Sequence, residues 1–260
     1  MIHNMSRRYC LSLLAIPGAG SLAGISAVTG FDFDKRRPKV LSLESFRVSS
    51  ADQMPRLHSY LERTLLPVLA EVHRGPKMLL EALVAPHTPQ VLFLSAFASF
   101  DEMIEIRGKV ASHPGIQRAR AELESGAAVI EEAQSQILVA THDSLKFDLR
   151  PTSGETGVFE LRSYRAPAWR DQPPAIISAA LRRSGIHPIV NASTTAGEQL
   201  PRFTYLIPFA SLAARQEAWT RFDSDSDWVG LQRESVVRFG SETKVTSASI
   251  YGVAPYSPVS

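Results

Sequence analysis

The chain has 260 residues, of which 44% are hydrophobic and 21% are charged. This composition is ordinary for a globular protein of one large or two small domains. The formal net charge of +2 rests on Arg7 and Arg8, because residues 1–27 contain those two bases and no acid. The remainder is neutral and lacks the basic excess typical of nucleic-acid binders, so we expect no nucleic-acid partner.

The N-terminus predicts an export leader. Arg7 and Arg8 precede a moderately apolar, glycine-rich run over 11–28 that contains small residues near its end. This order is typical of a secretory signal peptide, and the arginine pair resembles a twin-arginine signal. We therefore predict a signal peptide over 1–28, a linker over 29–39, and a periplasmic or secreted protein. A membrane anchor is the alternative, but the proline and glycines of the run make a poor spanning helix, so we expect no stable membrane span.

The cysteine and histidine residues agree with an exported protein that binds no metal. The single cysteine, Cys10, lies inside the predicted leader, so the mature protein would have no disulfide and no cysteine nucleophile. The basic run 35–39 could form a nucleic-acid or membrane patch, but a solvated linker is the simpler interpretation. The histidines show no spacing that would place two on one face of an element, so we predict no metal site.

The elements of the first half, residues 40–150, are predicted from hydrophobic periodicity and from turn residues. The predicted strands cover 40–48, 78–85, 90–97 and 135–141, and the predicted helices cover 52–72 and start near Phe100 and Gly115. A turn with Pro86 and Pro89 separates the second strand from the third.

The second half, residues 151–260, follows the same order. The predicted strands cover 158–164, 186–192, 202–209 and 246–253, and the predicted helices cover 173–184, 211–222 and 226–239. Residues 93–100 and residues 205–212, which lie 112 positions apart, each read as a strand that runs into the start of a helix. The same separation of 112 positions pairs Leu138 with Ile250. We interpret the two halves as copies of one unit, with an insertion in the first.

The order β-α-β-β-α-β in each half is that of a ferredoxin-like unit, with one added helix in the second crossover. Such a unit covers one face of its sheet with helices and leaves the other face bare, so the second copy is the available partner. We therefore predict an α+β fold of two tandem ferredoxin-like repeats that pack sheet to sheet as a dimeric α/β-barrel. Dimers of single units would reach the same arrangement by symmetry.

The second copy resembles the NIPSNAP family, which belongs to the dimeric α/β-barrel superfamily. The residues that carry the resemblance are 159–165, 185–188, 201–219 and 227–228. The likeness covers roughly 158–255, whereas the first copy shares only the segment 95–102 and lacks the arginine and the paired tryptophans. The family has no well-established common catalytic activity. The resemblance therefore implies a fold much more than a function.

Strand alternation selects candidate site residues. In the first strand of the second copy, Glu160, Arg162 and Tyr164 share one face, and Phe159 and Leu161 share the other. We expect the apolar pair to pack under helices, so that the polar set faces the space between the sheets. The predicted ligand-binding residues that line the barrel are Glu44, Glu160, Arg162, Tyr164, His187, Tyr205 and Tyr251.

Carboxylates, an arginine and tyrosines in an enclosed space suit an anionic or phenolic ligand, or a general acid and base. The alternative is that Arg162 pairs with Glu160 or Glu44 in a purely structural network. His187 is a candidate axial ligand, because other members of the superfamily bind haem through a histidine. A histidine at a strand edge is more often structural, and we expect no cofactor. Trp219 and Trp228 are interpreted as core aromatics.

The sequence favours an exported NIPSNAP-type protein of undetermined activity. It would bind a small molecule in the barrel between the repeats, or assemble into a homo-oligomer. The alternative is an exported oxidoreductase or monooxygenase-like enzyme of the same superfamily, with or without haem. Whether the chain is an enzyme stays open at this point.

Overall fold

The computed structural model describes residues 39–125, 128–140, 157–165, 175–198, 200, 202–240 and 244–258. The predicted leader and the predicted linker, apart from Lys39, lie outside these residues. No helix in the described ranges is long and apolar enough to cross a membrane.

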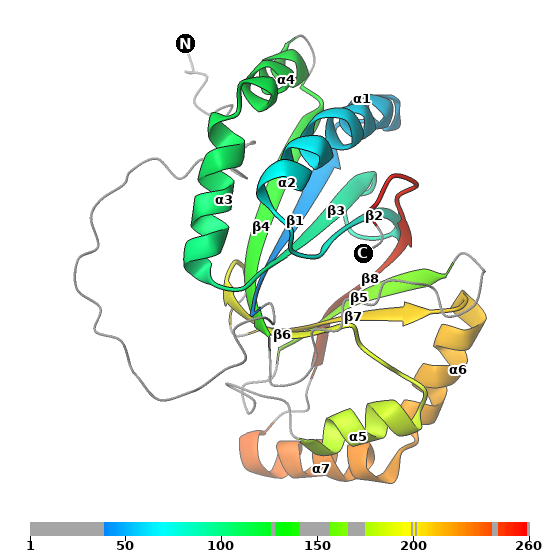
Figure 1. Cartoon of the computed structure of the whole chain (residues 1–260). Helices are drawn as coiled ribbons and strands as arrows, with labels where there is room; N and C mark the ends of the chain where they lie inside the picture. Colours follow the sequence, from blue (N-terminus) through cyan, green and yellow to red (C-terminus); the bar gives the residue numbers. More distant parts are fainter. Residues whose placement is uncertain are drawn as a thin grey trace, which may run out of the picture.

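Eight strands close into one barrel in the order β1-β3-β2-β8-β5-β7-β6-β4 (Figure 1). The strands are β1 (Val40–Val48), β2 (Lys77–Val84), β3 (Gln90–Phe97), β4 (Ile130–Ala140), β5 (Val158–Arg165), β6 (Val190–Ala196), β7 (Arg202–Phe209) and β8 (Lys244–Val253). Each neighbouring pair is antiparallel. The first half contributes β4-β1-β3-β2 and the second β8-β5-β7-β6, so strands of equal rank occupy equal places.

The two half-sheets pair at their edges, which closes the barrel, and their inner faces contribute to one buried cluster in the lumen. The edge strands β2 and β8 pair with Leu80 opposite Val253, and β4 pairs with β6 with Leu138 opposite Thr194. Closure gives every strand two hydrogen-bonded neighbours and removes the exposed edges that invite aggregation. The α+β class is confirmed, in the form of a single closed barrel.

Helices cover the outside of the barrel on two opposite sides (Figure 1). In the first half, η2 (Ala51–Gln53), α1 (Met54–Tyr60), the π-helical η3 (Leu61–Leu65) and α2 (Leu66–Val72) follow one another directly, and α3 (Phe100–Ser112) and α4 (Pro114–Glu124) form the second crossover. The second half has α5 (Ala175–Arg183), α6 (Leu212–Asp223) and α7 (Ser226–Phe239). The Oγ atoms of Ser99 and Ser211 accept the backbone N–H of Glu102 and Ala214, so α3 and α6 begin with the same type of cap.

The predicted element bounds agree with the structure within a few residues, except at β4 and β6. Strand β6 begins at Val190 and not at Ile186. The reason is a helix cap: the N–H of Gly185, at φ 79°, bonds to the carbonyl of Arg182, and the N–H of Ile186 bonds to that of Leu181. This Schellman pattern commits Ile186 to the end of α5 and leaves it unable to start a strand.

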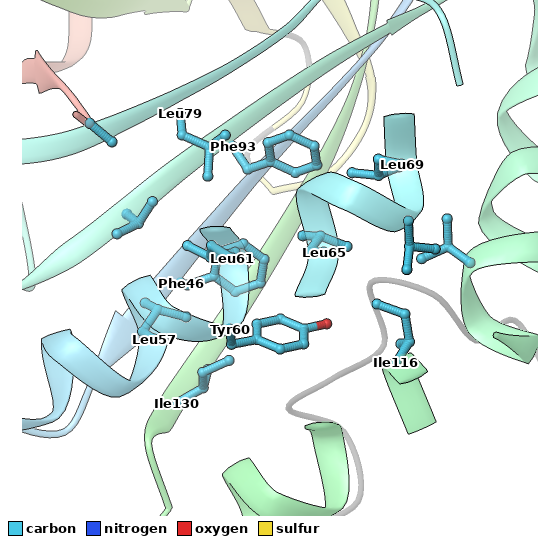
Figure 2. Packing of buried hydrophobic residues seen from close by; sticks show 14 of the residues in the cluster. Phe46, Leu57, Tyr60, Leu61, Leu65, Leu69, Leu79, Phe93, Ile116 and Ile130 are labelled. Atoms are coloured by element: carbon cyan, nitrogen blue, oxygen red, sulfur yellow. The ribbon is translucent and has the colours of Figure 1, made fainter. Parts of the chain in front are cut away.

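Three clusters of buried residues form the core. One lies between the first half-sheet and its helices, where Phe46 and Phe93 of the strands lie near Leu61 and Leu65 of the helices (Figure 2). A second lies between the second half-sheet and α5 to α6. The third draws on all eight strands and on no helix, so it fills the barrel lumen. Strand alternation thus sends one set of side chains to the helices and the other into the lumen.

Candidate functional site

The polar residues of β5 face the helices and not the lumen, which corrects the prediction. Glu160 is fully buried. Its Oε1 accepts from Nη2 of Arg215 at 2.6 Å, and its Oε2 accepts from Nε1 of Trp219 at 2.6 Å, both residues lying on α6. Phe159 lies in the lumen cluster instead, and Leu161 packs against it. Alternation shows which residues share a face; which face turns inward depends on the helical partners available.

Arg162 completes this network. Its Nη1 lies 3.3 Å from Oε1 of Glu160, and its guanidinium carbon lies 3.8 Å from the centre of a Trp219 ring. Such stacking stabilises a cation whose hydration is reduced. The structural pairing of Arg162 with Glu160, which the sequence left as an alternative, is therefore present. Sequence reasoning missed Arg215, whose position one helical turn before Trp219 on α6 could have indicated it.

Two predicted tyrosines also lie under the helices. Tyr164 and Tyr205 belong to the second-half core and line a cavity of about 10 Å³ beside Trp219, which is room for a single water. Burial raises the pKa of Tyr164 to about 12 and raises that of Tyr205 as well. Neither phenol ionises near neutral pH, so neither is a general base at this place.

Glu44 occupies a comparable position in the first half. Its carboxylate accepts from Ser42 on the same strand and from Arg107 on α3, on the helix side of the sheet. Burial raises its pKa to about 7, against the opposing charge of Arg107. Its Oε2 is buried and has no hydrogen-bond partner in the described structure. Glu44 therefore does not line the lumen, and the prediction for it is corrected too.

A buried histidine lies on the same side of the first half-sheet as Glu44, the side that the helices cover. His73 is 1% exposed, stacks on Phe97, and has its Nε2 2.9 Å from the hydroxyl of Ser95, the cross-strand partner of Ser42. Its Nδ1 accepts from the backbone N–H of Gly75, so Nε2 carries the proton in the neutral ring. Burial, with the nearby charge of Lys77, lowers its pKa to about 4. In this tautomer the imidazole cannot take the hydroxyl proton of Ser95.

Of the predicted set, Tyr251 alone lines the lumen. It lies in the lumen cluster, and it also borders a cavity of about 130 Å³, which we call the cup. The lining residues come from both halves: Leu43, Ser45, Arg47, Pro86, His87, Gln90, Leu92, Glu132, Gln134, Gln136, Leu161, Arg202, Ser247, Ser249 and Tyr251. The structure thus brings Tyr251 together with residues that sequence reasoning did not select.

The cup has more polar lining residues than the lumen cluster. Along β1, the lumen-facing side chains change from Leu41 and Leu43 to Ser45 and then Arg47, and the cross-strand partner of Arg47 on β4 is Glu132. This change of character toward the end of a strand is visible in the sequence. It becomes informative only once the lumen face of β1 is known.

Two arginines line the cup from opposite halves. Arg47 lies with its Nη2 3.0 Å from Oε2 of Glu132 and 3.5 Å from Oε1 of Glu131. Burial lowers the pKa of Arg202, and the charge of Glu198 opposes that shift. Exposed His87, in the turn between β2 and β3, also lines the cup and has φ 60°, a left-handed conformation that is uncommon for residues other than glycine.

The residues present do not fit a haem held by His187. That residue is exposed in the segment between α5 and β6. It lines neither the cup, nor the small cavity beside Trp219, nor a third cavity of about 20 Å³ beside Glu44. The cup is also smaller than the roughly 300 Å³ at which pockets for drug-sized ligands begin. Among the described residues, no group of three or more His, Cys, Asp or Glu side chains is placed to hold a metal ion.

Comparison with known proteins places the fold. The family model NIPSNAP matches residues 155–258. A solved NIPSNAP family protein from Agrobacterium tumefaciens str. C58 is 22% identical and covers 40% of this chain and 95% of that chain, with a TM-score of 0.32. A putative chlorite dismutase is 15% identical and covers 85% of this chain and 96% of that chain, with a TM-score of 0.51.

A putative monooxygenase from Fusobacterium nucleatum subsp. nucleatum ATCC 25586 is 8% identical and covers 84% of this chain and 92% of that chain, with a TM-score of 0.45. A search of the curated proteins found no match. The likeness to the putative chlorite dismutase, over 85% of this chain, shows the barrel fold alone.

Proposed function

We propose that this protein, whose residues 155–258 match the NIPSNAP family model and join the first half in one closed barrel, binds a small molecule in the cup. The observation that carries the proposal is the cavity of about 130 Å³ walled by polar side chains of both halves. Eight-stranded barrels either fill their interior or leave space for one small ligand. Here the lumen cluster fills one part of the interior and the cup leaves the other part open.

The size of the cup limits the ligand. An apolar cavity of about 150 Å³ in another protein admits benzene, so the cup accommodates a molecule with a single ring or a similar group. Its hydroxyl, amide and guanidinium groups supply the few directed hydrogen bonds that give a ligand site its specificity. A ring-sized molecule with polar substituents fits both properties.

Filling the cup should abolish binding without unfolding the barrel. Ser247→Phe and Ser45→Phe place a phenyl ring in the cup from the second and the first half, because both serines line it. Benzoate, benzamide and benzamidine serve as probes, with affinities measured by ligand-observed NMR. We expect at least one probe to bind the parent chain, and each filling variant to weaken it by about tenfold or more.

The control for these variants is Ser112→Phe, at an exposed position near the end of α3. It adds the same ring outside the barrel and should leave the affinity unchanged. Binding that survives both filling variants, in chains that keep their circular dichroism spectrum, would place the ligand elsewhere. If none of the three probes binds the parent chain, the proposal is wrong.

We also propose that the two halves are copies of one ferredoxin-like unit. The equal strand orders and the equal caps of α3 and α6 support this. The small cavities under the helices agree as well, since Phe93 and Arg107 line one, and Tyr205 and Trp219 line the other at the repeat offset. A crystal structure should superpose the halves element by element; a different strand order in either half would contradict the duplication.

Export through a twin-arginine route is proposed from the sequence of the leader, which lies outside the described residues. The double substitution Arg7→Lys with Arg8→Lys keeps the charge and removes the paired guanidinium groups. In a bacterial host with a twin-arginine pathway, we expect the substituted chain to accumulate inside the cell as full-length precursor. Cell fractionation with immunoblotting checks this, and unchanged export of the substituted chain would contradict it.

A further inference from the structure

The floor of the cup is apolar. Leu43, Leu92 and Tyr251 line it and belong to the lumen cluster, and half-buried Leu161 packs against the same cluster. A floor of this kind favours the burial of apolar surface, and the ring of Tyr251 offers a face or an edge to a second ring. A flat group about the size of benzene suits both the floor and the volume of about 130 Å³.

Arg47 lines the cup and has one buried donor without an acceptor. Its Nη2 is engaged by Glu131 and Glu132, but its Nε is buried and has no hydrogen-bond partner in the described ranges. Buried donors in native proteins are nearly always paired, and an unpaired one points to a missing water, ion or ligand. The group that completes Arg47 must therefore be an acceptor.

The two arginines of the cup favour an acceptor that is also an anion. Arg47 and Arg202 line the cup together with one carboxylate, Glu132, and the carboxylates of Glu131 and Glu198 lie near the two arginines. Arg202 is half-buried, and a cation with reduced hydration interacts more strongly with an anion beside it. A planar carboxylate matches the fork of donors on a guanidinium better than a neutral oxygen does.

We propose that the ligand of the cup is a small aromatic carboxylate. Its ring lies on the floor formed by Leu43, Leu92, Leu161 and Tyr251, and its carboxylate meets the guanidinium groups of Arg47 and Arg202. This inference rests on the proposed function and adds a chemical class to it. Each half would then supply one arginine to the ligand, since Arg47 lies in the first half and Arg202 in the second.

The test uses three probes that share a ring and differ in charge: benzoate, benzamide and benzamidine. Their affinities for the full chain are measured by isothermal titration calorimetry at low salt. We expect benzoate to bind about tenfold or more tightly than benzamide, and benzamidine to bind weakest. Arg47→Gln and Arg202→Gln should each weaken benzoate by about tenfold and change benzamide by less than about twofold.

The matched control is Arg238→Gln, which removes an exposed arginine of α7 that pairs only with Glu234 among the ion pairs of the described chain. It should leave all three affinities unchanged. If benzamide binds as tightly as benzoate, and Ser247→Phe weakens both, the aromatic carboxylate is wrong while the cup remains a binding site. If no probe binds, the proposed function itself fails. If the Arg238→Gln variant loses as much benzoate affinity as the other two, the effect is one of net charge, and the proposal is overturned.

Discussion

Glu160→Ala is expected to lower the free energy of unfolding by about 3–5 kcal/mol. The substitution removes a fully buried carboxylate that accepts hydrogen bonds from Arg215 and Trp219 and lies beside Arg162. Two guanidinium groups with side-chain exposures of only 17% and 22% would then lack their counter-ion. Removing one partner of a buried ionic network leaves the others uncompensated, and that accounts for most of the loss.

Guanidinium chloride unfolding, followed by tryptophan fluorescence, measures this change, because Trp219 lies in the network. The matched control is Glu217→Ala, an exposed carboxylate on the same helix, which should change stability by no more than about 0.5 kcal/mol. A double-mutant cycle with Arg215→Gln should show strong coupling between the two sites. A loss below about 1 kcal/mol for Glu160→Ala would mean that the carboxylate reaches water, as it would have done in an open lumen.

The second large effect is a dependence of stability on pH that arises from Glu44. Its folded pKa of about 7 lies above the unfolded value of 4.5. Between these values the folded state keeps the proton and the unfolded state has released it, so stability falls as pH rises through the window. The shift corresponds to about 3 kcal/mol for a fully buried group.

His73 has the opposite effect in an overlapping window. Its folded pKa of about 4 lies below the unfolded value of 6.5, so the unfolded state binds the proton first and stability falls as pH drops below 6.5. From about pH 4.5 to pH 6.5, Glu44 and His73 contribute slopes of opposite sign to the plot of unfolding free energy against pH. The parent chain should therefore show little dependence of stability on pH in that range.

Single substitutions separate the pH dependence of stability that comes from Glu44 from that of His73. In Glu44→Gln, stability should rise with pH between about 4 and 6.5, because only the term from His73 remains. In His73→Phe, which keeps a ring to stack on Phe97, stability should fall as pH rises from about 4.5 to 7. Urea unfolding across this range checks both, and two variants with the same pH profile would contradict the assignment of these groups.

The sequence predicted the elements of this fold better than it predicted the site. The hydrophobic periodicity and the capping residues predicted most boundaries of the helices and strands, because those signals are local in the sequence. The direction in which the polar face of β5 points is not local. It depends on Arg215 and Trp219 of α6, which lie more than fifty residues later in the chain and satisfy Glu160 from outside the barrel.

Each half buries one carboxylate between its sheet and its helices. Each keeps one buried carboxylate on its first strand and holds it with an arginine from the second crossover helix: Glu44 with Arg107 on α3, and Glu160 with Arg215 on α6. The polar side chains most conspicuous in the sequence thus join each sheet to its own helices. The cup is built from less conspicuous residues, such as Ser45 and Gln134, which are recognisable only from the register of several strands.

The most direct test of the account is a crystal structure of the full chain soaked with benzoate. We predict electron density for the ring against Leu161 and Tyr251, with the carboxylate within hydrogen-bond distance of Arg47 or Arg202. A cup collapsed onto its own side chains, or benzoate bound only outside the barrel, would contradict a ligand site in the cup.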